Sequence, residues 1–250
     1  MQEREATKES LQKLEQLEKD REAVQKLASS KKVVHIIHTH NSEAFLPELE
    51  TDDPKEAHHH KINVTLIGEK LSQELEKRGI GTVVEKRDIQ AMLVERGWTY
   101  SQSYDASREL IKEVMQKEED LQYFFDIHRD SLPRKQTTVT LNGVDYAKTF
   151  FVIGGNFANY KENVHLAEQL HQRLEEKYPG VSRGVVVREG ARTNGKFNQD
   201  LSSNSLLIEV GGIENTLEET YRTAEALADV FADYYWEKEA AAASKGEEER

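Results

Sequence analysis

The sequence predicts an α/β fold: a three-layer sandwich in which helices flank a mostly parallel central sheet, preceded by an N-terminal helix. Short apolar runs typical of buried strands alternate with longer segments of helical periodicity, an order characteristic of parallel sheets. Hydrophobic residues make up 37% of the 250 residues, enough for a substantial core. Charged residues reach 32% and gather at both ends of the chain, which indicates solvated segments outside that core.

The N-terminal segment, residues 1–30, is predicted to be an amphipathic leader helix. Residues 4–29 contain no Pro or Gly. The apolar residues that recur at roughly helical spacing are Leu11, Leu14, Leu17, Val24 and Leu27. Because the heptad pattern is short and broken, a leader or stalk helix is favoured over a coiled-coil partner.

After residue 31 the pattern becomes that of a folded domain. The apolar run at 33–37 has charged residues before it and polar residues after it, as expected of a buried strand. Helical periodicity over 62–78 stops at Gly79. A second strand follows at 80–84, and a second periodic segment predicts a helix over 103–117.

The middle of the domain adds a strand, a hairpin and a helix. Residues 123–127 form an aromatic and apolar run typical of a strand. Residues 137–153 have the pattern of a hairpin, because Asn142 and Gly143 suit the left-handed positions of a two-residue turn. Helical periodicity over 160–177 ends near the Pro-Gly pair that follows.

Two strands and a helix complete the predicted domain, residues 31–236. The strands lie at 185–187 and 206–210, and the helix covers about 216–236. Residues 237–250 are nearly all Glu, Lys, Arg, Ala and Ser, so we expect a charged flexible tail. Ligands of such sheets bind beyond the carboxyl ends of the strands, which directs attention to the polar residues there.

Composition excludes several kinds of chemistry. The formal net charge of −12 argues against general nucleic-acid binding, because a polyanion would be repelled. There is no cysteine, which rules out disulfides, thiolate catalysis and Cys-ligated zinc. The sequence has no apolar run of about 18 residues that would span a bilayer, and no signal-peptide core follows Met1.

The first strand runs into a histidine-rich stretch that suggests a metal site. His40 and Glu43 form a His-x-x-Glu pair just past the strand, a spacing that turns an imidazole and a carboxylate toward one point. His38 precedes His40 by two positions, so in an extended chain both would face the same side. His38 is therefore a further candidate for shaping or binding.

A second strand ends in Asp-Ile-His-Arg-Asp-Ser at 126–131. His128 is a natural third ligand, and two histidines with a carboxylate leave zinc an open position for water. Asp126 or Asp130 is expected to accept the other ring N–H of a ligand. Arg129 is the best candidate for stabilising an oxyanion or binding a substrate carboxylate.

The third strand places one carboxylate, Glu209, within an apolar run. Burying a charge there is costly unless it is paired or functional. Beside a metal-bound water, Glu209 would act as general base and then as general acid. A structural histidine or an edge glutamate is the commoner explanation of any one of these residues. Their joint occurrence at strand ends favours a metal site.

Five blocks of the sequence resemble the stage II sporulation protein P family. They are His-Thr-His-x-x-Glu-x-Phe at 38–45, Asn-Val at 63–64 with Gly-Glu-Lys-Leu at 68–71, Asp-Ile-His-Arg-Asp-Ser at 126–131, Phe-Val-Ile-Gly-Gly-Asn at 151–156, and Glu-Val-Gly-Gly at 209–212. The resemblance covers roughly residues 31–236. It implies a fold like that of zinc N-acetylmuramoyl-L-alanine amidases, and a peptidoglycan hydrolase that removes stem peptides from glycan strands and also cleaves cross-links as an endopeptidase.

Residue by residue, the resemblance implies His40 and His128 as Zn²⁺ ligands and Glu209 as the catalytic acid and base. Related amidases take a carboxylate ligand from the start of the helix after the first strand. Here residues 60–63 contain no acid, which is a departure from that pattern. We therefore expect Glu43 as the remaining ligand, with a histidine of the 58–60 loop as the alternative.

The resemblance also implies a biological setting. Family members thin septal peptidoglycan during engulfment in endospore formers, alongside the stage II sporulation proteins D and M. They are membrane-anchored and act outside the cytoplasm, between forespore and mother cell. This chain shows no anchor, so we expect a soluble fragment or an anchor supplied elsewhere, with peptidoglycan as substrate and no nucleic-acid partner.

Two other classes of function stay open from the residues. A zinc carboxypeptidase-like peptidase would share the His-x-x-Glu pair and the distal histidine, but would need a basic residue for a free C-terminal carboxylate. A non-catalytic wall-binding scaffold module is suggested by the helical leader and the charged tail.

Overall fold

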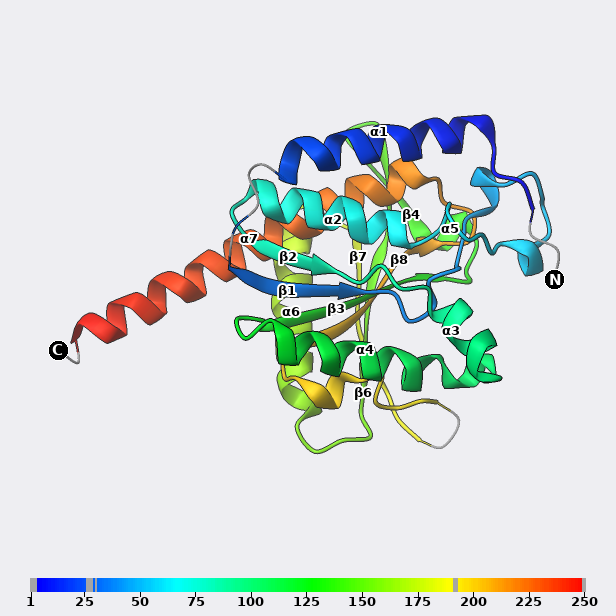
Figure 1. Ribbon diagram of the computed structural model, residues 1–250. Coiled ribbons are helices and arrows are strands. Elements are labelled where there is room, and N and C mark those ends of the chain that lie inside the picture. Colours follow the sequence, from blue (N-terminus) through cyan, green and yellow to red (C-terminus); the bar gives the residue numbers. More distant parts are fainter. Residues whose placement is uncertain (1–3, 26–28, 30, 191–192, 249–250) are drawn as a thin grey trace.

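The apolar runs of the sequence assemble into one central sheet, and helices cover both of its faces (Figure 1). The computed structural model describes residues 4–25, 29, 31–190 and 193–248. In these residues the sheet has the strand order β2-β1-β3-β8-β6-β7. Its strands are β1 Lys32–Ile37, β2 Gly81–Val84, β3 Tyr123–Asp130, β6 Thr149–Gly154, β7 Ser182–Arg188 and β8 Ser205–Gly212.

The sheet is mostly parallel, which confirms the predicted fold class. Strand β1 pairs in parallel with β2 and β3, and β3 pairs in parallel with β8. Strand β6 is antiparallel to β8 and parallel to β7. The carboxyl ends of β1, β3 and β8 therefore lie at the same edge of the sheet, where the sequence places its histidines and Glu209.

The helices form two unequal layers around the sheet. They are α1 Lys8–Gln25, α2 Thr65–Lys77, α3 Ile89–Arg96, α4 Ser103–Lys117, α5 Arg134–Thr137, α6 Tyr160–Lys177 and α7 Leu217–Glu248. Helices α2, α6 and α7 pack on one face in the larger hydrophobic core, and α1 lies outside α2. Helices α3 and α4 cover the opposite face in a smaller core that includes Ile37, Phe124 and Leu110.

The predicted hairpin is split between two sheets. Strands β4 Thr138–Leu141 and β5 Val144–Ala147 pair with each other around Asn142 and Gly143, which adopt positive φ as the turn requires. The chain then enters the main sheet as β6 after Lys148. The second arm of the hairpin predicted over 137–153 is therefore interrupted at Lys148 and divided between β5 and β6.

The N-terminal helix packs on the domain, and the C-terminal helix is longer than predicted. Helix α1 is packed on the domain, where Leu17 joins the main core, while the predicted helical position Leu27 lies outside the described residues. Helix α7 continues past residue 236 to Glu248 and projects beyond the sheet (Figure 1). The segment predicted as a charged tail is helical over 237–248, because its alanines and charged residues are good helix formers and extend the helix.

Candidate metal centre

The pairing of β3 with β8 places two of the predicted site residues side by side. His128 and Glu209 are Cα partners in this parallel ladder. Partners in register project to the same face of a sheet. Phe150 of β6 is the partner of Glu209 on its other side and shares that face. Helix α4 covers the neighbouring part of this face, so a polar cavity can form at the edge of the smaller core.

The chain turns sharply after β1 and separates the two histidines of the His-Thr-His stretch. Strand β1 ends at Ile37, and residues 39–42 form a turn. Asp126 of β3 fixes this turn by accepting hydrogen bonds from the Thr39 amide (2.8 Å) and from Thr39 Oγ1 (2.6 Å). Because the chain is no longer extended here, His38 and His40 enter different cavities.

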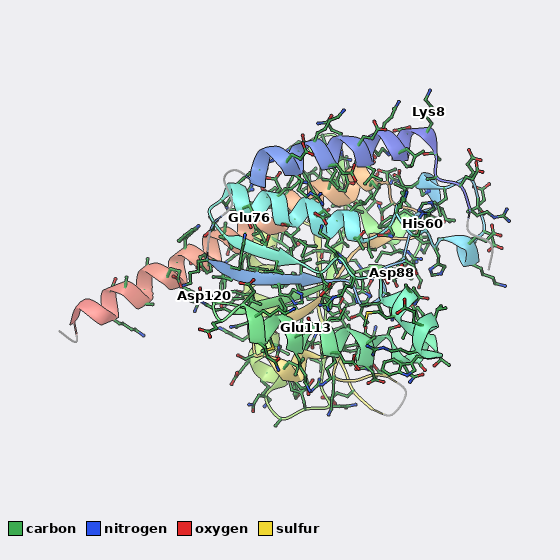
Figure 2. All side chains as sticks on the ribbon, in the orientation of Figure 1. Lys8, His60, Glu76, Asp88, Glu113 and Asp120 are labelled. Carbon is green, nitrogen blue, oxygen red and sulfur yellow. The ribbon has the colours of Figure 1, made fainter. Side chains whose placement is uncertain are left out.

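His38 does not join the predicted ligands, which corrects the expectation that it faces the side of His40. It is buried against Gly68 of α2 and lines a cavity with His60 and Asp88. Figure 2 shows His60 and Asp88 at the end to which β1 and β2 point, opposite Glu76. Burial lowers the pKa of His38 to about 3, so this imidazole is neutral.

His40, Glu43 and His128 form a compact group that fits a metal ion. The Glu43 carboxylate lies between the two imidazoles, with Oε1 3.5 Å from His40 Nδ1 and Oε2 3.6 Å from His128 Nδ1. One ligand atom from each residue lies within 4.8 Å of the others. Two imidazole nitrogens and one carboxylate oxygen are a donor set typical of catalytic zinc, which keeps a further position open.

The electrostatics of this group keep Glu43 ionised. Burial alone would raise the pKa of Glu43, but its interactions with His128 and His40 outweigh burial and hold that pKa well below its usual range. Burial would likewise lower the pKa of His128, but the carboxylates of Asp126 and Glu43 raise it well above its ordinary value. A bound cation would take the place of the proton that His128 holds between these carboxylates.

Asp126 rather than Asp130 faces the second ring nitrogen of His128. Asp126 Oδ1 lies 3.0 Å from His128 Nε2, on the side away from Glu43. With a cation bound in place of that proton, such a carboxylate would keep the ring oriented with Nδ1 toward the ligand group. Asp130 instead pairs with Arg183 of β7 at 2.7 Å, although it also lines the cavity.

Arg129 has a different position from the one expected of a substrate-binding residue. Its side chain is buried and donates from Nε to the Ala44 carbonyl (2.8 Å) and from Nη2 to the Ala57 carbonyl (3.1 Å). Its backbone amide donates to Glu43 Oε2 at 3.1 Å. Arg129 therefore fixes the loop that carries Glu43, and its guanidinium is engaged with that loop. The local sequence gave no sign of these distant partners.

The 58–60 loop lies beside the site. Among the described residues, none of its histidines belongs to the group formed by His40, Glu43 and His128. His58 forms an isolated antiparallel bridge with Glu43. His59 is buried, and its Nδ1 accepts hydrogen bonds from the amides of Lys61 and Ile62. This backbone contact gives His59 a structural role at the approach to α2.

Glu209 and the ligand group share a cavity of about 430 Å³. Burial raises the pKa of Glu209 to about 7 from 4.5. Its Oε2 is buried and has no hydrogen-bond partner among the described residues. A carboxyl group with this pKa and a free oxygen is suited to accept and return a proton near neutral pH.

Sequence reasoning missed three residues that line the cavity, Tyr104, Phe197 and Arg188, and a fourth, Tyr100, that contacts one of its histidines. Tyr100 stacks on His40, with ring centroids 4.5 Å apart, and Tyr104 of α4 lies edge-on to the same ring. Phe197 and Arg188 complete the wall away from the ligands. Tyr104 lay in a predicted helix, and Tyr100 and Phe197 lay in short polar segments. Arg188 directly follows the strand predicted at 185–187, but it has no neighbour at a metal-binding spacing.

The model of the stage II sporulation protein P (SpoIIP) family matches residues 1–232. The chain belongs to the stage II sporulation protein P family. It is also 48% identical over 218 residues to the stage II sporulation protein P of Bacillus subtilis (strain 168), covering 87% of this chain. The match covers 54% of that relative, so the chain spans about half of its length.

A solved structure supports the fold of this SpoIIP family member. The CwlD amidase from Clostridioides difficile, solved in complex with the GerS lipoprotein, matches with a TM-score of 0.51 and 16% identity. The match covers 83% of this chain and 99% of that one. At this identity the likeness concerns the arrangement of strands and helices. Among the described residues, no helix has the length and apolar character needed to cross a membrane.

Proposed function

We propose that this SpoIIP family member is a zinc-dependent peptidoglycan hydrolase. Its substrate would be the amide between N-acetylmuramic acid and the stem peptide. The observation that carries the proposal is the cavity in which His40, Glu43 and His128 meet beside Glu209. Family membership and the amidase-like fold favour cell-wall amides over other amides.

His40, Glu43 and His128 would hold the zinc ion. The donor set fits this ion, because it offers two nitrogens and one oxygen within ligand spacing of one another. When bound, zinc would lower the pKa of a water molecule to about 7 and polarise the carbonyl of the amide. Asp126 would hold the His128 ring in the orientation that ligation requires.

Glu209 would move the proton during cleavage. Its carboxyl group lies in the same cavity as the ligands, with a pKa of about 7. In the ionised form Glu209 would accept a proton from the attacking water, and in the protonated form it would return that proton to the amine that leaves. Tyr104 forms part of the cavity wall next to His128 and would help to exclude bulk water.

A direct test compares the wild type with Glu209→Gln and His128→Ala on purified peptidoglycan. We expect both variants to keep the fold, measured by circular dichroism, and to lose the release of stem peptides. Loss of a positioned acid and base typically lowers the rate by about 10²- to 10⁴-fold. Full activity in either variant would remove the proposed site from the reaction.

The metal is tested separately by exhaustive chelation followed by addition of zinc. We expect chelation to abolish activity and zinc to restore it, and elemental analysis to find about one zinc per chain. Zinc content should fall in His40→Ala and in Glu43→Ala. Activity that survives chelation would contradict the proposal, and a chain that takes up no metal would favour a non-catalytic wall-binding module.

Cleavage of plain peptides would separate this proposal from a carboxypeptidase-like peptidase. A muramoyl amidase requires the sugar lactyl group next to the scissile amide, whereas a peptidase does not. We expect muropeptides to be cleaved and the matching free peptides to resist. Conversion of cross-linked muropeptide dimers into monomers would add the endopeptidase activity that the family resemblance implies.

In the whole protein we propose an extracytoplasmic role in thinning the septal wall during engulfment. The partners would be the peptidoglycan and the stage II sporulation proteins D and M, with a membrane anchor holding the domain near the wall. Co-purification of the intact protein from sporulating cells tests these partners directly.

A further inference from the structure

Arg188 stands out among the charged residues of the cavity. It is the last residue of β7, is exposed, and lines the same cavity as Glu209 and His40. Within residues 4–25, 29, 31–190 and 193–248, its side chain makes no ion pair or hydrogen bond, whereas the other arginines described there each do. A cation that faces a binding cavity without a protein partner is available to a ligand.

The other residues of the cavity that carry a formal charge are acidic, in contrast to Arg188. Glu43, Asp130 and Glu209 are all acids, and the chain as a whole carries a formal charge of −12. Asp130 is already paired with Arg183. Away from the proposed metal group, Arg188 is therefore the unpaired cation of this cavity among the described residues, and it attracts an anionic part of a substrate.

The strand register sets the distance between Arg188 and the reacting end of the cavity. Phe150 is the partner of Glu209, and Gly154 of the same strand is the partner of Arg188. Gly154 lies four residues beyond Phe150, or about 13 Å along the strand, and β7 lies two strand spacings, about 10 Å, from β8. The Cα atoms are therefore about 16 Å apart. An arginine side chain that extends along the face toward Glu209 brings its guanidinium to about 10 Å from that carboxyl group.

A gap of about 10 Å corresponds to about three residues of extended peptide. The wall between the two ends is apolar and aromatic, formed by Phe150, Val152, Leu207 and Phe197. Such a wall suits the body of a peptide, and the guanidinium at its end suits a carboxylate, which it can bind through two parallel hydrogen bonds.

We propose that Arg188 selects the substrate by binding a free carboxylate about three residues from the attacked carbonyl. The ligand class is an acidic stem peptide, and Arg188 is a specificity residue that acts on binding rather than on the chemical step. This inference rests on the proposed function, because it uses the cleaved amide to define one end of the cavity. It gives Arg188 the carboxylate-binding role that the sequence had suggested for Arg129.

The test uses pairs of synthetic muramoyl peptides that differ only in a carboxylate or a carboxamide on the third residue. For the zinc-loaded wild type we expect kcat/KM to be roughly tenfold or more higher for the carboxylate, since a charge-assisted hydrogen bond is lost in the carboxamide. Arg188→Ala should lower this ratio to about one, mainly through KM, and Arg188→Lys should keep part of it.

Two controls locate the effect. The same carboxamide change on the second residue should alter kcat/KM little in the wild type, because that position is too near the reacting end. Arg173→Ala removes a cation from α6, on the opposite face of the sheet, and should keep the full selectivity. A wild type that does not distinguish the third-residue pair, or an Arg188→Ala variant that still does, would overturn the inference.

A failure of the proposed function would look different, because the wild type would then cleave neither peptide. In that case calorimetry of the intact peptides with the wild type and Arg188→Ala still decides the role of Arg188. Tighter binding of the carboxylate peptide to the wild type alone supports the inference. Equal binding of both peptides contradicts it.

Discussion

His128 and Glu209 lie directly opposite each other as Cα partners in the β3–β8 ladder. This pairing brings together a proposed metal ligand and a proposed proton carrier that are far apart in the sequence. Neither residue depends on a flexible loop for its position, because both belong to central strands of the sheet. The backbone ladder therefore fixes the relative position of two groups on which the proposed chemistry depends.

The pKa of Glu209 gives a prediction for stability in metal-free protein. Burial raises the pKa of this carboxyl group to about 7 from 4.5. Between these values the folded chain holds a proton that the unfolded chain releases, so folding stability falls as the pH rises through this window. Glu209→Gln removes this loss. From about pH 4 to about pH 8 its free energy of unfolding should rise by up to about 3 kcal/mol relative to the wild type.

Denaturant unfolding in the presence of a chelator measures this difference at the two pH values. The comparison of variant with wild type cancels the titration of the other groups. Asp200→Asn is a suitable control, because this exposed carboxylate pairs with Arg108 and its pKa is lowered rather than raised. A free-energy difference between Glu209→Gln and wild type that is the same at both pH values would contradict the buried, protonated carboxyl group.

The strand ends were the part of the site that sequence could predict. Parallel strands bring their carboxyl ends to one edge, so His40, His128 and Glu209 were expected to meet once each was placed at or within a strand. The prediction for His38 failed because it assumed an extended chain, whereas β1 stops at Ile37. The turn depends on hydrogen bonds to Asp126, a contact between distant segments that periodicity does not record.

The partners of Arg129 could not be predicted either, because they too lie in distant segments of the chain. Its position beside His128 suggested an active-site cation, but its partners are carbonyls of residues 44 and 57. Alternation along a strand tells which face a side chain takes, and it does not tell which loop covers that face. Helix α3 was missed because its eight residues carry little periodicity.

Arg129→Lys tests whether this buried side chain holds Glu43 in place. Lysine keeps the charge but cannot reach the Ala44 and Ala57 carbonyls together, so buried acceptors lose their donors. We expect the free energy of unfolding to fall by about 2–4 kcal/mol. Zinc affinity should fall by about 10- to 100-fold, because the support of a ligand is lost. Calorimetric zinc titration and thermal unfolding measure the two effects, and wild-type zinc affinity in the variant would refute the supporting role.

Glu48 connects helix α1 to the domain and is the basis of a third prediction. The side chain is 1% exposed and accepts from Ser10 Oγ (2.6 Å), Lys13 Nζ (3.1 Å) and the Leu217 amide (2.7 Å). Glu48→Gln keeps the shape but weakens the charge-assisted bonds, and should lower the free energy of unfolding by about 1.5–3 kcal/mol. A double-mutant cycle with Ser10→Ala should give a coupling of about 0.5–3 kcal/mol. Strict additivity would show that α1 is not held through this contact.

Gly68 gives a prediction whose sign is opposite to ordinary helix propensity. An alanine in a helix interior is usually more stable than glycine by about 1 kcal/mol. At Gly68, however, a Cβ atom would lie 2.2 Å from His38 Nε2 and 3.0 Å from Ile36 Cγ2. His38 directly follows β1 and its ring is buried, so the ring cannot move aside freely. Gly68→Ala should therefore lower the free energy of unfolding by about 1–3 kcal/mol.

The His38→Ala background separates this steric effect from helix propensity. Removing the imidazole removes the closest clash, so the same Gly68→Ala change should become neutral or stabilising there. The measurement is denaturant unfolding of the wild type, both single variants and the double variant under one set of conditions. If Gly68→Ala stabilised the wild type, His38 could not be packed on this helix. If Gly68→Ala destabilised both backgrounds equally, the contact of the added Cβ with Ile36 rather than with His38 would cause the loss of stability.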